Sequence, residues 1–279
     1  MDRRKAMKIT TGAFALGGVG LFTLTNVFKP EKKPDVLPQK LQFNPEENKW
    51  NFFTLDPVIT AQLAYDYYNE GSCMFATIKS IISQLVKKIG EPYTSFPVNM
   101  FKYGHGGIGG YGSVCGALNG AAAIIGLLIP DKKVQDNMIN DIFQWYEKES
   151  FPQFNPVNPK LDFTPSASIS NSVLCHASNT NWSKASGYTV SSNERKERCR
   201  RLTADVAQKV AASLNEIFTN VYVTNSVSND EATTCMACHG NEGKIKNTSV
   251  KMSCTSCHSE SVGHHVFADV HYKFMKEQL

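Results

Sequence analysis

The sequence has little charge and lacks the patterns of several common functions. Charged residues make up 19% of its 279 residues, and the net charge is only +4. No basic stretch is interleaved with aromatic residues, and no glycine fingerprint of a nucleotide-binding loop occurs, so nucleic-acid binding is not indicated. No Ser-His-Asp arrangement or acid–base pair is evident. A hydrophobic content of 42% still predicts a globular protein rather than a disordered one.

Convincing β-strands are also lacking, and helical patterns take their place. Asp56-Pro57 is typical of a helix start, and Gly90 of a helix end. Apolar residues then recur at helical spacing in several segments, which predicts about four or five amphipathic helices. The expected helices span Ile59–Asn69, Cys73–Ile89, Ser113–Leu128, Asp131–Glu149 and Glu194–Phe218, with a final one over His264–Lys276. We therefore expect a mainly α protein, a helical bundle with a small irregular C-terminal domain.

Two short motifs near the end of the sequence carry a specific chemistry. They read Cys-Met-Ala-Cys-His over 235–239 and Cys-Thr-Ser-Cys-His over 254–258. C-x-x-C-H is the attachment signal of a c-type haem: the two thiols bond to the porphyrin, and the His binds the iron. The alternative is one zinc ion held by two Cys-x-x-Cys pairs, although zinc would not require a His after each pair. The predicted attachment residues are Cys235, Cys238, Cys254 and Cys257, and the predicted proximal ligands are His239 and His258.

Each haem iron also needs a ligand on its other face. His264 and His271 lie on one face of an expected helix, about 10.5 Å apart along its axis, which suits two closely stacked haems. His265 points elsewhere and would reach across a dimer interface. Methionine is the rival ligand type and would raise the reduction potential. The remaining candidates are His105 and His176, with Met252 and Met275 as possible methionine ligands.

The N-terminal residues 1–28 are typical of an export signal. Arg3-Arg4 precedes an apolar run that ends near Val27, which resembles a twin-arginine signal, with an ordinary Sec signal as the alternative. No clear cleavage site follows, so this segment could stay as a membrane anchor. Either signal predicts a periplasmic protein, which agrees with haem attachment after export. A proline-rich linker over 29–56 would then lead to a helical domain (57–228) and a dihaem domain (229–279).

Four cysteines remain outside the haem motifs. In an exported protein they would ordinarily form two disulfides. They could instead hold an iron–sulfur cluster through four thiolates, because helix N-termini near several of them would stabilise an anionic centre. Glycines crowd around one of them and would let backbone approach a cofactor closely. These cysteines are Cys73, Cys115, Cys175 and Cys199.

The order of these four cysteines resembles a known family. Cys73, Cys115-Gly-Ala-Leu-Asn-Gly120, Cys175 and Cys199 are similar to the redox-active family named for its C, GCAxxG, C, C pattern. The match departs from it at Val114 and in placing Gly120 one residue late. With two haem motifs following, the sequence resembles the split-Soret cytochromes c. That resemblance implies a homodimer, two bis-histidine haems per chain, one axial histidine given by the partner subunit, and a [2Fe–2S] cluster in the helical domain.

These features together favour an electron-transfer protein over an enzyme. Two adjacent haems and one cluster form a chain for single electrons, in anaerobic-type respiration, and a protein partner would exchange them. The alternatives are a small reductase of nitrogen oxides, peroxide or thiols, which needs an open haem position or a reactive cysteine, and a binding module that senses redox state.

Overall fold

The computed structural model describes residues 50–224 and 230–254, all within one compact unit of the chain. Several predicted features lie outside these residues: the signal segment, most of the linker, the helix over 264–276 and Met275. The same holds for Cys257, His258, His264, His265 and His271.

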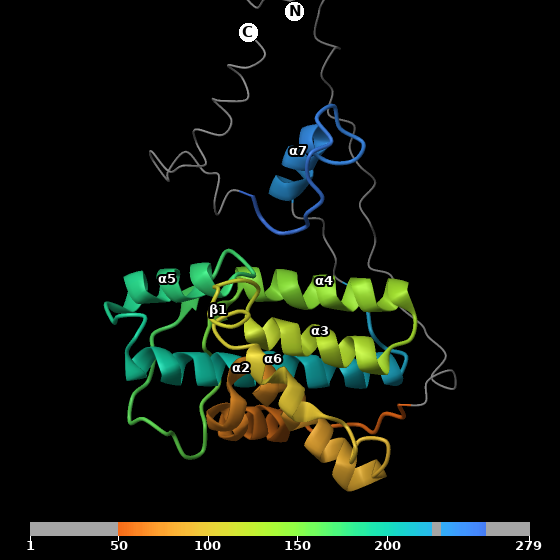
Figure 1. Cartoon of the computed structure of the whole chain (residues 1–279), viewed down its shortest axis with the longest axis vertical. Coiled ribbons are helices and arrows are strands. Elements are labelled where there is room, and N and C mark those ends of the chain that lie inside the picture. The colour runs from red at the N-terminus through yellow and green to blue at the C-terminus, as the bar shows by residue number, and fades with distance from the viewer. Residues whose placement is uncertain (1–49, 225–229, 255–279) are drawn as a thin grey trace, which may run out of the picture. The chain divides into compact units, whose positions relative to one another are not determined.

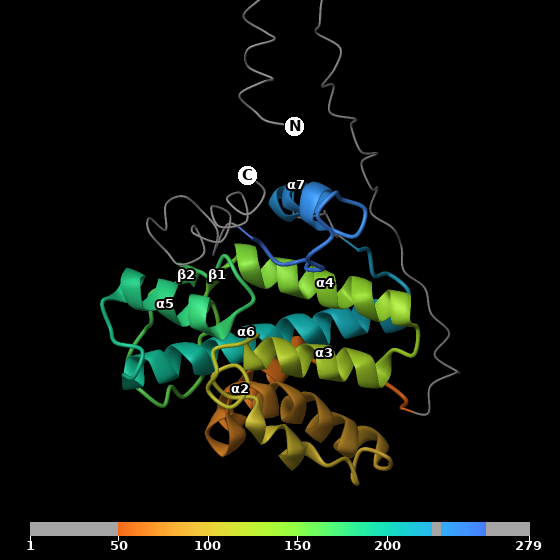
Figure 2. The same cartoon turned by 45° about the horizontal axis from the view of Figure 1, so that its top comes forward.

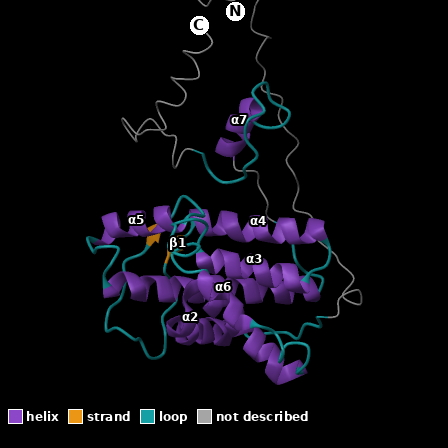
Figure 3. Cartoon of the chain, in the orientation of Figure 1, coloured by secondary structure: helices purple, strands orange, loops and turns teal. Residues whose placement is uncertain are grey.

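The described residues are mainly helical, as predicted (Figures 1 and 3). Strand is limited in this part of the chain to one short antiparallel pair, which closes the long loop between α4 and α5. The helices are α2 (Pro57–Ile89), α3 (Gly116–Leu128), α4 (Lys132–Lys148), α5 (Cys175–Ser186), α6 (Asn193–Phe218), α7 (Asp230–His239) and the 3-10 helix η2 (Val98–Tyr103); the strands are β1 (Ser150–Phe151) and β2 (Ser168–Ile169).

The helix ends follow from local chemistry. The carboxylate of Asp56 accepts the N–H groups of Val58 at 2.8 Å and Ile59 at 3.1 Å, so it caps α2. Asp131 caps α4 in the same way through Val134, at 3.0 Å. Gly90 ends α2 with a φ of 83°, which glycine adopts without steric cost. The predicted starts at Asp56 and Asp131 and the predicted end at Gly90 are therefore confirmed.

Helix α2 is broken in its middle. Gly71 and Ser72 have non-helical backbone angles, and Ser72 has a φ of 64°, in the left-handed region. The helix restarts at Cys73, and the N–H of Met74 bonds to the carbonyl of Gly104 at 3.3 Å instead of to its own helix. The break therefore gives α2 a second N-terminus, at the place where the glycine-rich loop begins.

The core forms where α2, α3, α4 and α6 meet. Helices α3 and α6 lie between α4 on one side and α2 on the other (Figures 1 and 2). The predicted apolar stripe of α6 is buried against these neighbours, and so are large apolar side chains of α2 and α3. Fully or almost fully buried members include Ile78, Leu85, Leu118, Ile124, Val206, Val210 and Leu214. No helix within the described residues is long and apolar enough to cross a membrane.

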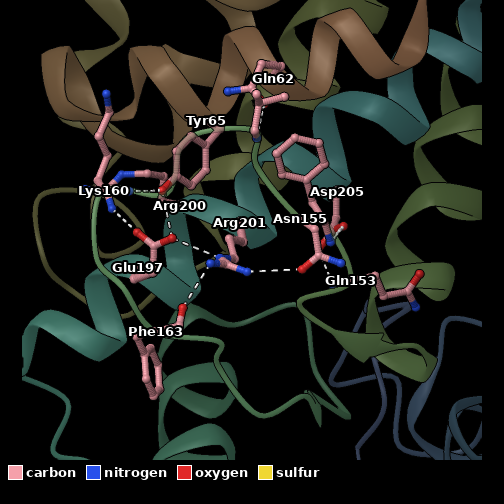
Figure 4. Close-up of polar contacts among 12 residues, drawn as sticks. Gln62, Tyr65, Gln153, Asn155, Lys160, Phe163, Glu197, Arg200, Arg201 and Asp205 are labelled. Carbon is pink, nitrogen blue, oxygen red and sulfur yellow. Dashed lines mark hydrogen bonds and ion pairs between the residues drawn. The ribbon is translucent and has the colours of Figure 1, made fainter.

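The N-terminal half of α6 buries charge as well as apolar surface (Figure 4). Glu197 is fully buried, forms ion pairs with Arg200 and Arg201, and accepts the Tyr65 hydroxyl at 2.8 Å. Arg201 also donates a hydrogen bond to the carbonyl of Phe163 at 2.9 Å. This network fastens the long loop between β1 and β2 to the helical core.

Backbone groups of the same loop bind Asp205 and the same Tyr65 (Figure 4). Asp205 accepts the N–H groups of Gln153 at 2.9 Å and Phe154 at 2.8 Å. The hydroxyl of Tyr65 accepts the N–H of Lys160 at 2.7 Å. The loop is therefore ordered by its main chain, although its sequence predicts no regular structure.

Candidate four-cysteine site and haem motif

The four cysteines outside the haem motifs come from four different helices. Cys73 begins the second half of α2, Cys115 is the N-cap of α3, Cys175 is the first residue of α5, and Cys199 lies in the N-terminal part of α6. Three of them thus lie at or beside a helix N-terminus, where free N–H groups and the helix dipole favour negative charge. The sequence predicted such helix starts for Cys73 and Cys115, but not for Cys175, because α5 was missed.

A short backbone bridge brings two of these helix starts together. Val114 and Leu174 pair in an antiparallel bridge. On either side, the N–H of Cys115 bonds to the carbonyl of Val173, and the N–H of Cys175 to that of Ser113, both at 2.8 Å. Cysteines that are far apart in the sequence therefore lie side by side in the fold.

None of these four thiols forms a disulfide with a described residue, so this part of the chain contains neither of the two disulfides that were the alternative. Cys115 and Cys199 are buried, and Cys73 and Cys175 are partly so. Burial raises the pKa of Cys73 well above its usual value and that of Cys175 to about 12, and the neighbouring cysteines add to both shifts. The thiols are thus close enough to influence one another electrostatically, and Cys73 and Cys175 would ionise readily only when bound to a metal.

Polar side chains surround the sulfur atoms. The amide of Asn179 donates to Sγ of Cys175 at 3.1 Å, and its oxygen lies 3.4 Å from Sγ of Cys199. The hydroxyl of Tyr68 lies 3.8 Å from Sγ of Cys73. Such groups donate hydrogen bonds to metal-bound thiolates and tune their potential. Sequence reasoning did not find Tyr68 or Asn179, because neither belongs to a motif.

A buried guanidinium completes these surroundings. Arg198 is 1% exposed, its Nη2 donates to Ser178 at 2.8 Å, and its Nη1 lies 3.9 Å from Sγ of Cys199. Its Nε has no hydrogen-bond partner, and it forms no ion pair with any described residue. A buried charge is costly unless an anion compensates it. Four thiolates around iron would supply that anion, so the residues present fit an iron–sulfur centre.

The four thiols do not converge on a single point. Within the described residues, no group of three or more His, Cys, Asp or Glu side chains is arranged to hold one metal ion.

Glycines let backbone close tightly around the site. A Cβ on Gly116 would lie 2.1 Å from the carbonyl oxygen of Gly104 and 3.0 Å from Cβ of Cys73. A Cβ on Gly120 would lie 2.9 Å from the carbonyl oxygen of Met74, where α3 packs against α2. The glycines that follow Cys115 are therefore required by close packing of α3 against α2 and the Gly104 carbonyl, whereas the expected approach of backbone to a cofactor stays a prediction.

The first haem motif forms the C-terminal half of α7. Cys235 and Cys238 are three residues apart on a helix, so they are neighbours on its surface, and His239 is its last residue. The ring Nδ1 of His239 lies 2.9 Å from Oδ1 of Asn247, and the Asn247 N–H bonds to the His239 carbonyl at 3.0 Å. When Nδ1 carries the proton and donates it to Asn247, Nε2 carries no proton, as the nitrogen that binds iron must.

The other described candidates lie elsewhere. His105, in the glycine-rich loop, and His176, on α5, are both exposed. Met252 packs against the core of the helical domain. Of the second haem motif, Cys254 is described and partly buried.

Comparison with known proteins places this arrangement in a family. Residues 75–213 match a family of redox-active proteins described as C_GCAxxG_C_C. A curated relative, split-Soret cytochrome c from Desulfovibrio desulfuricans (strain ATCC 27774 / DSM 6949 / MB), is 39% identical over 219 residues, which are 75% of this chain and 77% of the relative.

A solved structure agrees with the sequence match. That structure is described as a novel iron centre in the split-Soret cytochrome c from Desulfovibrio desulfuricans ATCC 27774. The match covers 77% of this chain and 95% of that chain, with a TM-score of 0.71 and 35% sequence identity. Sequence, fold and the order of the cysteines thus lead to one conclusion: the chain belongs to the split-Soret cytochrome c family.

Proposed function

We propose that the protein is an exported electron carrier with two haem c groups and a [2Fe–2S] cluster. The observation that carries this proposal is the meeting of four free thiols beside Arg198, a buried cation that forms no ion pair with a described residue. With two disulfides, its charge would face only Asp205, a carboxyl whose pKa burial raises to about 7, whereas thiolates bound to iron would compensate it directly. The solved relative is described as containing an iron centre, which agrees with this assignment.

The residues of the site have separate roles in this proposal. Cys73, Cys115, Cys175 and Cys199 bind the iron. An iron–sulfur cluster, when bound, takes up and releases one electron at a time. Asn179 donates a hydrogen bond to Sγ of Cys175. The Tyr68 hydroxyl accepts from the Cys73 thiol and would donate to that sulfur once it is a thiolate. The apolar core around Cys115 excludes water, so the site changes little when its charge changes.

The haem region completes the carrier. Cys235 and Cys238 attach the first haem and His239 binds its iron, while Cys254, Cys257 and His258 do the same for the second. His264, His271 and His265 are the proposed distal ligands, one of them given by the partner subunit of a homodimer. With histidines on both faces, neither iron is open to substrate, which favours a carrier that serves a redox partner protein over a reductase.

Export supports the same assignment. The haem motifs require attachment after export, and Arg3-Arg4 resembles the signal of a pathway that carries folded proteins. A cluster inserted in the cytoplasm needs such a pathway, because its ligands must already be in place. We therefore propose a periplasmic location, with the N-terminal segment as a possible anchor, and a role in anaerobic-type respiration.

The test is the ratio of total iron to covalent haem in the full-length protein, matured in a host that attaches haem c and purified without oxygen. A [2Fe–2S] cluster beside two haems gives about two irons per haem. Cys115→Ser should lower the ratio to about one, whereas Ser83→Ala, at a buried hydroxyl of α2, should leave it unchanged. A ratio of about one in the unaltered protein would refute the cluster. A haem spectrum that changes on addition of cyanide or carbon monoxide would refute the closed haem sites.

A further inference from the structure

Three buried arginines on α6 differ in how their charge is compensated. Arg200 and Arg201 form ion pairs with the carboxylate of Glu197. Arg198 is more deeply buried than either and has no ion pair among the described residues. Arg198 is therefore the one of the three without an ion pair. Asp205 is the carboxyl that interacts electrostatically with it, but burial raises the pKa of that carboxyl to about 7. Arg198 also lies next to Cys199 in the sequence.

Neighbouring side chains fix the position of Arg198. Its Nη2 donates to the hydroxyl oxygen of Ser178 on α5, and the hydroxyl of Tyr146 on α4 lies 3.0 Å from the same oxygen. Cys115 is the second thiol that the guanidinium influences, after Cys199. Held from α4, α5 and α6 in a dry interior, this charge acts on the thiols without solvent screening.

Two guanidinium groups act on the cysteines, that of Arg198 and that of the partly buried Arg195. We propose that Arg198, the fully buried one, is a fixed counter-charge of the four-cysteine centre and makes its one-electron reduction more favourable. The inference rests on the proposed function. Reduction adds one electron from a one-electron donor, here a haem or a redox partner, and no proton need accompany it. The centre becomes more negative by one charge, and a buried cation stabilises the reduced form more than the oxidised form.

The test uses the full-length, haem-loaded protein with its iron and compares three variants. Arg198→Met removes the charge and keeps most of the volume, and Arg198→Lys keeps the charge. Arg200→Met is the matched control, because it also removes one buried arginine from α6 but one whose charge Glu197 compensates. Iron per haem is measured first, and the midpoint potential of the cluster is then followed by electron paramagnetic resonance, which distinguishes it from the haems.

We expect Arg198→Met to lower the equilibrium constant for cluster reduction at least tenfold, which is about 59 mV for one electron. Arg198→Lys and Arg200→Met should change it less than threefold. Two irons per haem with an unchanged potential in Arg198→Met would overturn this proposal alone. About one iron per haem in the unaltered protein would overturn the proposed function and this proposal together.

Stability of the iron-free protein gives a second, independent readout. Without the cluster, the buried charge of Arg198 destabilises the folded protein. After iron removal by a chelator, Arg198→Met should therefore unfold at the same temperature as the unaltered chain or at a higher one. Arg200→Met should unfold at a lower temperature, because it takes one partner from a buried ion pair. A purely structural Arg198 would make both variants less stable. That result, or a failure of both Arg198→Met and Arg198→Lys to bind iron although folded, would overturn the proposal.

Discussion

Replacing Glu197 by Gln should destabilise the protein more than any similar change on its surface. Glu197 is fully buried, binds two guanidinium groups and accepts the Tyr65 hydroxyl. Gln keeps the size of the side chain but leaves Arg200 and Arg201 buried without their counter-charge. Removing one partner of a buried ion pair costs about 3–5 kcal/mol in the free energy of unfolding.

An exposed ion pair elsewhere in the fold provides the matched control. Glu70 binds Lys79 at 2.5 Å, but its side chain is 47% exposed. Water and salt screen such a pair, so Glu70→Gln should cost about 0–1 kcal/mol. The two variants make the same chemical change and differ only in burial.

The assay is equilibrium unfolding in urea, followed by far-ultraviolet circular dichroism and by the fluorescence of buried tryptophans such as Trp182. The two signals must coincide for a two-state analysis to hold. With a slope of about 2 kcal/mol per molar urea, Glu197→Gln should lower the midpoint by about 1.5–2.5 M. If it costs no more than Glu70→Gln, the charge of Glu197 does not hold the two arginines and the reasoning is wrong.

Three further predictions test other parts of the fold. Gly116→Ala should reduce the iron per haem, because its Cβ would collide with the Gly104 carbonyl and approach Cys73. On the same helix, a Cβ at Gly126 would meet nothing within 4 Å, so Gly126→Ala should stabilise the chain by about 0.5–1 kcal/mol. Burial raises the pKa of Asp205 to about 7, so the folded state holds a proton that the unfolded chain releases near pH 4. The free energy of unfolding should therefore fall by at most about 4 kcal/mol as pH rises from about 4 to 7. Asp205→Asn should flatten that dependence in urea unfolding measured over a pH series. Leu118→Ala should lower the free energy of unfolding by about 2–5 kcal/mol through the cavity it leaves in the core, measured in the same assay.

Much of the helical architecture could be predicted because its signals are local. Asp56, Gly90 and Asp131 act on residues within one turn of themselves, so their roles are visible in the sequence. The apolar stripe of α6 likewise identifies its buried face by spacing alone.

Helix α5 was missed because its stabilising contacts are distant. Its sequence is mostly polar, and only Ser178 and Trp182 are buried. Trp182 anchors the helix through an indole N–H that bonds to the Ser166 carbonyl at 2.9 Å. Such a helix is specified by tertiary packing rather than by its own periodicity.

The four cysteines of the candidate site could be grouped from the sequence, but their surroundings could not. Family resemblance grouped the four cysteines, yet only the backbone bridge at Val114 and Leu174 shows how two of them become neighbours. Charged residues are usually exposed, so nothing in the sequence marked Arg198 and Glu197 as buried. His258, His264, His265 and His271 lie outside the described residues, and every haem-ligand assignment, that of His239 included, stays a prediction.

The loop between β1 and β2 has a consequence for how this protein can vary. Tyr65, Arg201 and Asp205 hold it through the amides of Gln153, Phe154 and Lys160 and the carbonyl of Phe163. A contact made by main chain does not depend on the side chain at that position, so positions such as Gln153 and Lys160 can vary between species or accept new residues by engineering. Two loop side chains are different, because Asn155 accepts from Arg201 at 3.2 Å and Phe154 packs against Tyr65. Evolutionary constraint should therefore fall on these two positions and on the residues of α2 and α6 that bind the loop, and not on the rest of its sequence.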